Sequence, residues 1–235
     1  MNVIDYVIIG IVGVSLLFGL YRGFITSVLG VVCVFAAMFA AYAIGPTVAS
    51  AIIGNETIVQ TLSHYTDAAS RLGDLDMSRM SVLGLDAATI AQIVQRADLP
   101  APFDTLLANN MTQRVFEAIG SNTVSAYINQ TIVSAIVSIL SYIVVFIAAY
   151  VALSLLTGLI GYVFRFPSLK HLDALLGGAF GIVRGVFVVY VVFALAPIVM
   201  TVLPFDGFGE LVQASQIGSA MYRSNIVTTI LQGHI

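Results

Sequence analysis

The residues of this chain that could carry chemistry are few and lie far apart in the sequence. His171 and Asp173 stand two positions apart beside Lys170 and could relay a proton, although a loop histidine in such a setting more often provides ordinary interfacial polarity. The other histidines, His64 and His234, lie in separate regions, and the sequence has no HExxH, GxSxG, Walker A or paired-cysteine motif. We therefore expect neither a catalytic site nor a bound cofactor.

The single cysteine and the net charge argue against two further classes of site. Cys33 lies inside an apolar run, so one chain can build neither a disulfide nor a zinc cluster from it, and we interpret it as a packing residue. The formal net charge of −3 and the lack of a long block of Lys or Arg do not suit nucleic acid. We expect lipid and protein as partners instead, with no metal.

The composition indicates that the elements holding these residues lie in lipid. The chain is 59% hydrophobic and 9% charged, whereas about 25% of an average globular protein is charged. Stretches without any charged residue, each able to hold a span near the ~20 apolar residues that cross a bilayer, lie between Asp5 and Arg22, Arg22 and Glu56, Glu117 and Arg165, and Arg184 and Asp206. We predict an all-α, polytopic membrane protein with about four transmembrane helices.

The spans follow from these stretches and from the residues that interrupt them. A short turn at Tyr21-Arg22-Gly23 joins the first two spans as an antiparallel hairpin. The second span should end at Gly45-Pro46, because proline cannot continue the hydrogen-bond ladder. A polar, interfacial lead-in should precede the third span. The predicted spans are Val3–Leu20, about residues 24–44, about residues 132–162, and a last span that ends before Pro204.

The start of the last span decides where Arg184 lies. If the span begins at Ala174, Arg184 lies about 15 Å along the helix and close to the middle of the membrane, where an arginine is costly and usually functional. If it begins at Gly185, Arg184 is an ordinary interfacial anchor. We favour the interfacial position.

Most of the remaining charge is concentrated between the two hairpins. Eight of the twelve acidic and four of the nine basic residues lie between Glu56 and Glu117. Asp86 is a suitable N-cap for a helix ending near Arg96, a second helix should start near Phe103, and residues 56–71 could form another. We therefore predict a small helical insertion, and a four-part chain: an N-terminal transmembrane hairpin (1–50), a polar helical insertion (51–121), a C-terminal transmembrane hairpin (122–205) and an amphipathic tail (206–235).

Small residues recur at every fourth position in two places, at Gly19, Gly23 and Ser27 and at Gly177, Gly181 and Gly185. Such a row lets a neighbouring helix approach closely in lipid. The rows could pack one helix on another within the chain, or form a homo-oligomer interface. If both short loops lie on one side, Asp173 could also neutralise Arg22 or Arg184 and tie the hairpins together.

The short loops carry the charge bias that sets orientation. Arg22 lies in the first short loop, Arg165 and Lys170 lie in the last together with an interfacial Arg184, and both loops fall on one side of a four-span bundle. Positive charge in short loops favours the cytoplasm, whereas long insertions count little. We therefore predict cytoplasmic short loops, with both termini and the insertion outside.

The sequence resembles the colicin V production protein family. The likeness covers about residues 1–45 and 132–205, and it is carried by Asp5 in the opening IDYVII, by the turn Tyr21-Arg22-Gly23-Phe24, and by the segment LDALLGGAFGIVRG at residues 172–185. The resemblance implies structural or coupling roles for Asp5, Arg22, Gly23, Phe24, Asp173, Gly177, Gly181, Arg184 and Gly185. The long polar insertion departs from shorter members and could be a partner-binding module.

The resemblance also implies a function and a location. Family members are multi-pass proteins of the bacterial inner membrane, with a non-enzymatic role in toxin production or export, or in cell-envelope homeostasis. The expected partners are membrane lipid, a protein that binds through residues 51–121, and a second copy of the chain through the glycine rows. The alternative is a small oligomeric channel or transporter.

Overall fold

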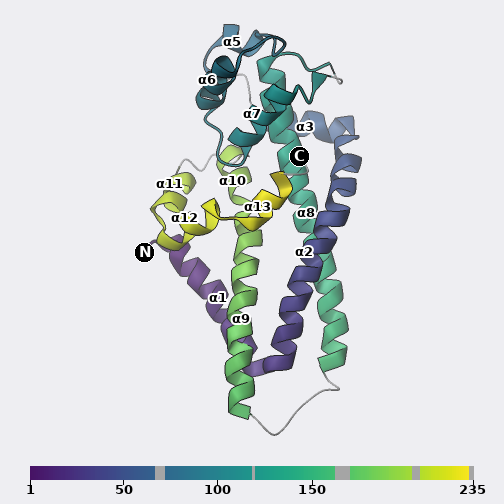
Figure 1. Ribbon diagram of the computed structural model, residues 1–235, viewed down its shortest axis with the longest axis vertical. Coiled ribbons are helices and arrows are strands. Elements are labelled where there is room, and N and C mark those ends of the chain that lie inside the picture. The colour runs from purple at the N-terminus through teal and green to yellow at the C-terminus, as the bar shows by residue number, and fades with distance from the viewer. Residues whose placement is uncertain (67–71, 118–119, 162–169, 203–206, 233–235) are drawn as a thin grey trace. The chain divides into compact units, whose positions relative to one another are not determined.

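The computed structural model describes residues 1–66, 72–117, 120–161, 170–202 and 207–232 (Figure 1). Within these ranges the chain is helical and has no β-strand, only an isolated bridge between Ser81 and Thr123. The helices are α1 (Val3–Arg22), α2 (Phe24–Ile53), α3 (Glu56–Thr66), α5 (Leu75–Arg79), α6 (Ala87–Ala97), α7 (Phe103–Gln113), α8 (Val124–Gly161), α9 (Lys170–Phe193), α10 (Ala196–Val202), α11 (Phe208–Ala214), α12 (Gln216–Arg223) and α13 (Ile226–Gln232).

Four stretches are long and apolar enough to cross a membrane: Val3–Arg22, Phe24–Ile53, Val124–Gly158 and Leu172–Val202. Lipid cannot form hydrogen bonds with backbone amides and carbonyls, whereas a helix pairs these groups within itself. A chain this apolar is therefore expected to cross the membrane as helices. The predicted fold class, an all-α polytopic membrane protein with about four spans and an insertion between the second and third, is confirmed.

Contacts group the chain into two compact units. The first contains Met1–Pro46, Ser141–Ala196 and Asp206–Val227, and the second contains Thr47–Leu140, Pro197–Phe205 and Thr228–Ile235. Each unit therefore collects segments that are distant in sequence. The predicted four-part division, which follows sequence order, stays a prediction.

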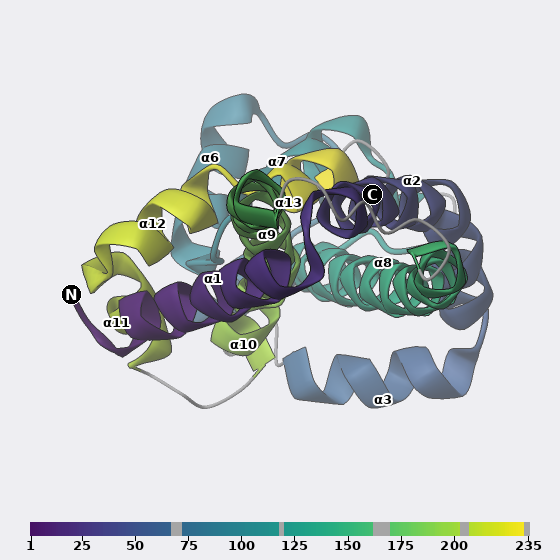
Figure 2. The same cartoon turned by 90° about the horizontal axis from the view of Figure 1, so that it is seen from below.

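In the first unit α1 runs against α9, and α11 and α12 lie beside the first turns of α1 (Figure 1 and Figure 2). The lower part of α2 and the end of α8 complete this unit. The N-terminus of α1 is fixed by a capping box, in which Asn2 accepts from the amide of Asp5 and the Asp5 carboxylate accepts from the amide of Asn2.

In the second unit the insertion forms short helices, as predicted. The Asp86 side chain accepts from the Thr89 amide at 3.0 Å and caps α6, and α7 starts at Phe103. Helix α3 covers Glu56–Thr66, and the rest of the segment predicted as helix to residue 71 lies outside the described residues. The short helix α5 was not predicted; Asp74 caps it and pairs with Arg96 at 3.3 Å.

The predicted end of the second span at Gly45-Pro46 is wrong, because α2 continues through Pro46 to Ile53. The last turns of α2 have an apolar face to bury, and Ala49 packs in a cluster with Val133 and Val137 of α8. A proline within a membrane helix removes one hydrogen bond but is tolerated where neighbouring helices hold the chain. Packing therefore outweighs the local signal for a break.

The polar lead-in predicted before the third span is not a separate element, because α8 is one helix from Val124. The polar residues of its first turns have partners in the insertion. Asn110 of α7 donates to the Thr131 hydroxyl at 3.1 Å, and the Phe116 and Tyr127 rings meet edge to face with their centroids 5.3 Å apart. The first turns of α8 thus pack against the insertion within the second unit.

The last span begins at neither of its predicted limits, because α9 starts at Lys170. Arg184 therefore lies within the helix, about 21 Å from its first residue, and the favoured start at Gly185 is wrong. The helix ends at Phe193, and α10 begins at Ala196 with Pro197 in its first turn, where the missing amide hydrogen costs nothing.

The pattern of apolar residues in the tail suggests one amphipathic helix over residues 210–235, and this is wrong. Its described residues form three short helices, which break at Ser215 and again near Ser224 and Asn225. Ser215 caps α12 by accepting from the Gly218 amide at 2.7 Å, and α11 and α12 contact α1. The hydroxyl and amide side chains at these positions compete with the helix backbone and end each segment.

Stability of the insertion should depend on its aspartate caps. Hydrogen bonds from the Met77 amide hold the pKa of Asp74 below 3.8, and bonds from Thr89 do the same for the pKa of Asp86. The stabilisation is present above about pH 4 and is lost as the pH falls through the folded-state values. We expect the melting temperature, followed by circular dichroism from pH 7 to pH 3, to fall further in wild type than in D74N/D86N, because asparagine caps without titrating. Equal losses in both proteins would contradict this.

Candidate functional site

The seam between α1 and α9 is built from glycine. A Cβ atom at Gly19 would lie 2.9 Å from the carbonyl carbon of Gly177 and 3.1 Å from the Cα of Gly181. A Cβ at Gly185 would lie 3.0 Å from the Cα of Val12. These approaches are shorter than ordinary van der Waals contact, so the two backbones touch only because side chains are missing.

The glycine rows therefore pack on each other within one chain. Ser15 strengthens the seam, because its hydroxyl donates to the Gly181 carbonyl at 2.7 Å across the two helices. Formation of a homo-oligomer through these rows stays a prediction, and it would have to displace contacts that the chain already makes with itself.

Asp173 joins the last hairpin to the first. Its Oδ1 accepts from the backbone amide of Phe24 at 2.9 Å, which satisfies one of the free amides at the start of α2. Gly23 has φ +81°, and a Cβ there would lie 3.0 Å from the Asp173 Cγ, so the turn needs glycine for both its conformation and its space. The Phe24 and Phe180 rings meet edge to face, with centroids 5.5 Å apart.

The two hairpins are thus joined by a hydrogen bond between the Asp173 carboxylate and the Phe24 backbone amide. The sequence suggested Arg22 or Arg184 as the partner of Asp173, and this is wrong, since within the described ranges the only ion pair joins Arg96 and Asp74. A carboxylate that accepts from a helix N-terminus gains both a hydrogen bond and a favourable dipole.

Asp173→Ala should lower the free energy of unfolding by about 1.5–3 kcal/mol, the usual range for a hydrogen bond to a charged group. Asp173→Asn keeps an oxygen that can accept from Phe24 and should retain most of the stability. Thermal unfolding of the purified protein in detergent measures both variants, and equal losses for alanine and asparagine would contradict the bond to Phe24.

Asp5 anchors the tail to the start of α1. Its side chain is buried, with 0% of its surface exposed. Oδ1 accepts from the Ser215 hydroxyl at 2.6 Å and from the Ile217 amide at 2.9 Å, and Oδ2 accepts from the Asn2 amide at 2.8 Å. A buried carboxylate is costly unless it is fully hydrogen-bonded, and these donors meet that need. The bond joins residues 210 positions apart.

Arg184 is held between α1 and α2. Its Nε donates to the Ser15 hydroxyl at 3.1 Å, and its Nη1 lies 3.5 Å from where a Cβ at Gly30 would be. The arginine thus occupies space that the missing side chain of Gly30 leaves open. Ser15 lies level with Gly181, one turn before Arg184, so the guanidinium leans toward the start of α9.

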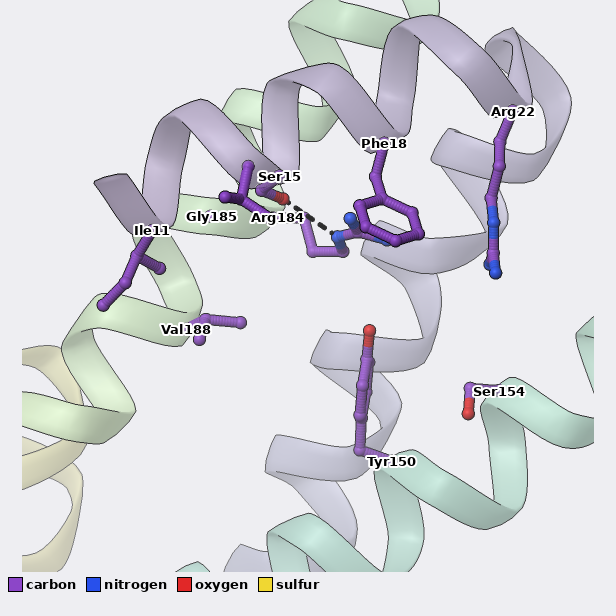
Figure 3. Close-up of a pocket in the computed structure, with 10 residues that line it drawn as sticks. Ile11, Ser15, Phe18, Arg22, Tyr150, Ser154, Arg184, Gly185 and Val188 are labelled. Atoms are coloured by element: carbon purple, nitrogen blue, oxygen red, sulfur yellow. Dashed lines mark hydrogen bonds between the residues drawn. The ribbon is translucent and has the colours of Figure 1, made fainter. Parts of the chain in front are cut away.

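Arg22 and Arg184 open onto one cavity of about 410 Å³ (Figure 3). Arg22 is exposed, with its guanidinium carbon 5.6 Å from the centre of the Phe18 ring, a cation–π contact. Tyr150 and Ser154 of α8 face the arginines from the other side of the cavity. Neither arginine has a carboxylate partner among the residues that the structure describes.

The predicted site residues therefore fall into three groups. The first group lies where α9 contacts α1 and the first turn of α2, and it consists of Gly23, Phe24, Asp173, Gly177, Gly181 and Gly185. The second group, Arg22 and Arg184, lines the cavity. Asp5 lies alone near the start of α1. Gly185 also belongs to the cavity wall. The predicted proton relay involves the His171 side chain, which lies outside the described part of the chain.

Sequence reasoning missed the residues that partner these groups. Asn2 was detectable, because Asn followed three positions later by an acid just before an apolar run is a capping-box pattern. Ser215, Gly30 and Tyr150 carry no local signal, since their roles depend on helices that meet only in the fold.

Fold and site together define a helical, multi-pass membrane protein in which motif aspartates fasten helix ends and motif arginines line a cavity. A family model for the colicin V production protein matches residues 4–72 and 105–224. The chain therefore belongs to the colicin V production protein family. No curated protein and no solved structure matches it.

The family match is wider than the resemblance read from the sequence. It includes both ends of the insertion and most of the tail, and it leaves out residues 73–104, which contain α5 and α6. The Ser215 partner of Asp5 lies inside the matched region, so the anchor of the tail is built from residues that the family model covers.

Proposed function

We propose that the protein is a non-enzymatic component of the bacterial inner membrane that supports toxin production or export, or cell-envelope homeostasis. The observation that supports the proposal is that the two motif aspartates hold helices together. Asp5 and Asp173 each accept hydrogen bonds that join distant segments, which is a structural use rather than an arrangement around a reacting group. A protein of this kind acts through contacts with lipid and with other proteins.

The proposed orientation places the turn at Arg22 and residues 162–169 in the cytoplasm, with the termini and the insertion outside. The positive charge of the short loops supports it. Fusion of a fluorescent protein that folds only in the cytoplasm to Ile235 tests it, because a dark fusion is expected and a bright one would overturn the orientation.

We propose the insertion, residues 51–121, as the surface for a protein partner. Residues 73–104 lie outside the family match, and this part carries exposed charges such as Arg96 and Asp74. Crosslinking from residues 73–104 in intact cells should capture a defined partner that crosslinking from exposed sites on α1 does not. Identical products from both positions would contradict a partner surface here.

Complementation tests the cellular role. In a bacterial strain without its own family member, this chain should restore colicin V production or survival under envelope stress. Asp5→Ala and Asp173→Ala should fail to do so, whereas Glu210→Ala, a change at an exposed carboxylate of α11, should succeed. Failure of the wild-type chain in both assays, with normal membrane insertion, would overturn the proposal.

A small oligomeric channel or transporter is the second candidate, and the position of Arg22 and Arg184 on one cavity favours it, since charges within a bundle often mark a substrate path. Ion flux from purified protein in liposomes separates the two. Flux that is abolished by Arg184→Ala would favour transport, and no flux under any condition would favour the contact role.

A further inference from the structure

We propose that the cavity between α1, α8 and α9 binds the phosphate of an anionic phospholipid. The cavity presents two guanidinium groups on one side and an aromatic hydroxyl on the other, and apolar side chains line the end away from Arg22 (Figure 3). This combination fits an amphiphile with one negatively charged end.

The two arginines of the cavity favour an anionic ligand. Arg22 and Arg184 line the same opening, and no carboxylate in the described part of the chain pairs with either of them. Arg184 lies about 16 Å beyond Asp173 along α9, well inside the apolar stretch Leu172–Val202. An uncompensated arginine at that depth is expensive, and a bound phosphate would offset the cost.

The donor geometry suits phosphate. Nε of Arg184 is occupied by Ser15, and this bond fixes the side chain so that its terminal nitrogens remain for a ligand. Guanidinium groups bind phosphate through paired hydrogen bonds, which a lysine cannot form. Tyr150 lies on the facing wall and directs its hydroxyl toward Phe18 and Arg184, where it can supply a further donor.

The apolar lining and the position favour a lipid over a free ion. Ile11, Val14 and Val188 lie along the cavity wall beside the arginines, where the first methylene groups of an acyl chain would pack. A cavity of about 410 Å³ accommodates a head group but not a whole lipid, so the acyl chains would extend into the bilayer. Arg22 ends α1, at the membrane end where lipid phosphates lie, and the Arg184 guanidinium leans toward that same end from within the span.

Lipid binding at this cavity goes beyond the proposed cellular role, because a membrane protein can hold a specific lipid whatever process it serves. The binding assay also needs no knowledge of that process. A failure of complementation and a failure of lipid binding are therefore separate results.

The test is the retention of phosphatidylglycerol by the full-length protein, measured by native mass spectrometry after exchange from mixed micelles. Phosphatidylcholine is the zwitterionic comparison, and inorganic phosphate at 10 mM is the free-ion comparison. Wild type should retain phosphatidylglycerol over phosphatidylcholine, and phosphate should not displace it.

The variants assign the binding to this cavity. R22Q/R184Q should lower retention at least tenfold, whereas R223Q, which removes an exposed arginine of α12, should leave it unchanged. If R184Q disturbs folding, the single variants R22Q and Y150F still test the proposal, because neither side chain supports the glycine seam. Each should lower retention of phosphatidylglycerol severalfold. Unchanged retention in folded R22Q and Y150F, equal retention of phosphatidylcholine, or displacement by phosphate would overturn the proposal.

Discussion

Gly177→Ala should destabilise the protein, although the same substitution in an open helix position normally stabilises it. A Cβ at Gly177 would lie 2.7 Å from the carbonyl carbon of Gly23 and 2.9 Å from its oxygen, and it would also meet the Gly19 carbonyl. These atoms belong to the backbone of α1 and its turn, so no change of side-chain rotamer can relieve the clash. The helices would have to separate along the seam.

We expect a loss of about 2–3 kcal/mol in the free energy of unfolding, the upper part of the range for overpacked sites. Gly13→Ala is the matched control, because a Cβ at Gly13 would meet nothing within 4 Å. It should be neutral or slightly stabilising, since alanine is the better helix former. Unfolding in detergent with increasing SDS measures both.

This pair of variants also separates the two uses predicted for the glycine rows. If the rows formed only an interface between copies of the chain, Gly177→Ala would change the oligomeric state and leave the unfolding of the monomer unaffected. That outcome would contradict the seam between α1 and α9.

Asp5→Ala should release α11 and α12 from the start of α1. The Ser215 hydroxyl and the Ile217 amide would both lose their acceptor in a buried position, and each orphaned donor costs about 1–3 kcal/mol. We therefore expect a loss of about 3 kcal/mol, which corresponds to a rise of roughly 100-fold in the open population of the tail.

Trypsin cleavage after Arg223, the last residue of α12, reports this opening, because the bond is cut only when the helix unfolds. The cleavage rate, followed by mass spectrometry, should rise by about the same factor as the open population. Ser215→Ala removes the hydroxyl donor itself, so no donor at that position is left without an acceptor, and the cleavage rate should rise less than in Asp5→Ala. Glu210→Ala, at an exposed carboxylate of α11, should cleave at the wild-type rate. Equal rates for Asp5→Ala and wild type would show that the tail is held by other contacts.

The sequence was sufficient for features that depend on composition and local pattern. The absence of charge over long stretches located the spans, and Asp86 located the start of α6, because an N-cap acts within a few residues. The glycine spacing indicated a close helix contact. It could not name the helix on the other side, since a row of bare Cα atoms carries no information about its partner.

Features that depend on packing were beyond local reasoning. Pro46 signals a helix end, yet α2 continues because its last turns bury Ala49 against α8. The charge-free stretch after Arg184 suggested that the last span begins at Gly185 and that Arg184 lies at the interface. The structure instead includes Arg184 in α9, where Ser15 and Gly30 of other helices accommodate its side chain. Asp5 and Ser215 meet only after the whole chain has folded.

The central claim is a division of roles, in which Asp5 and Asp173 fasten the helices and Arg22 and Arg184 remain open to an anion. A cryo-electron microscopy map tests it most directly, taken with an antibody fragment bound to the full-length protein in nanodiscs that contain phosphatidylglycerol. We predict contact between the backbones of α1 and α9 at Gly19 and Gly177, and phosphate density beside Arg22 and Arg184. A map in which α1 lies apart from α9, or in which either arginine pairs with a carboxylate of the chain, would contradict the account.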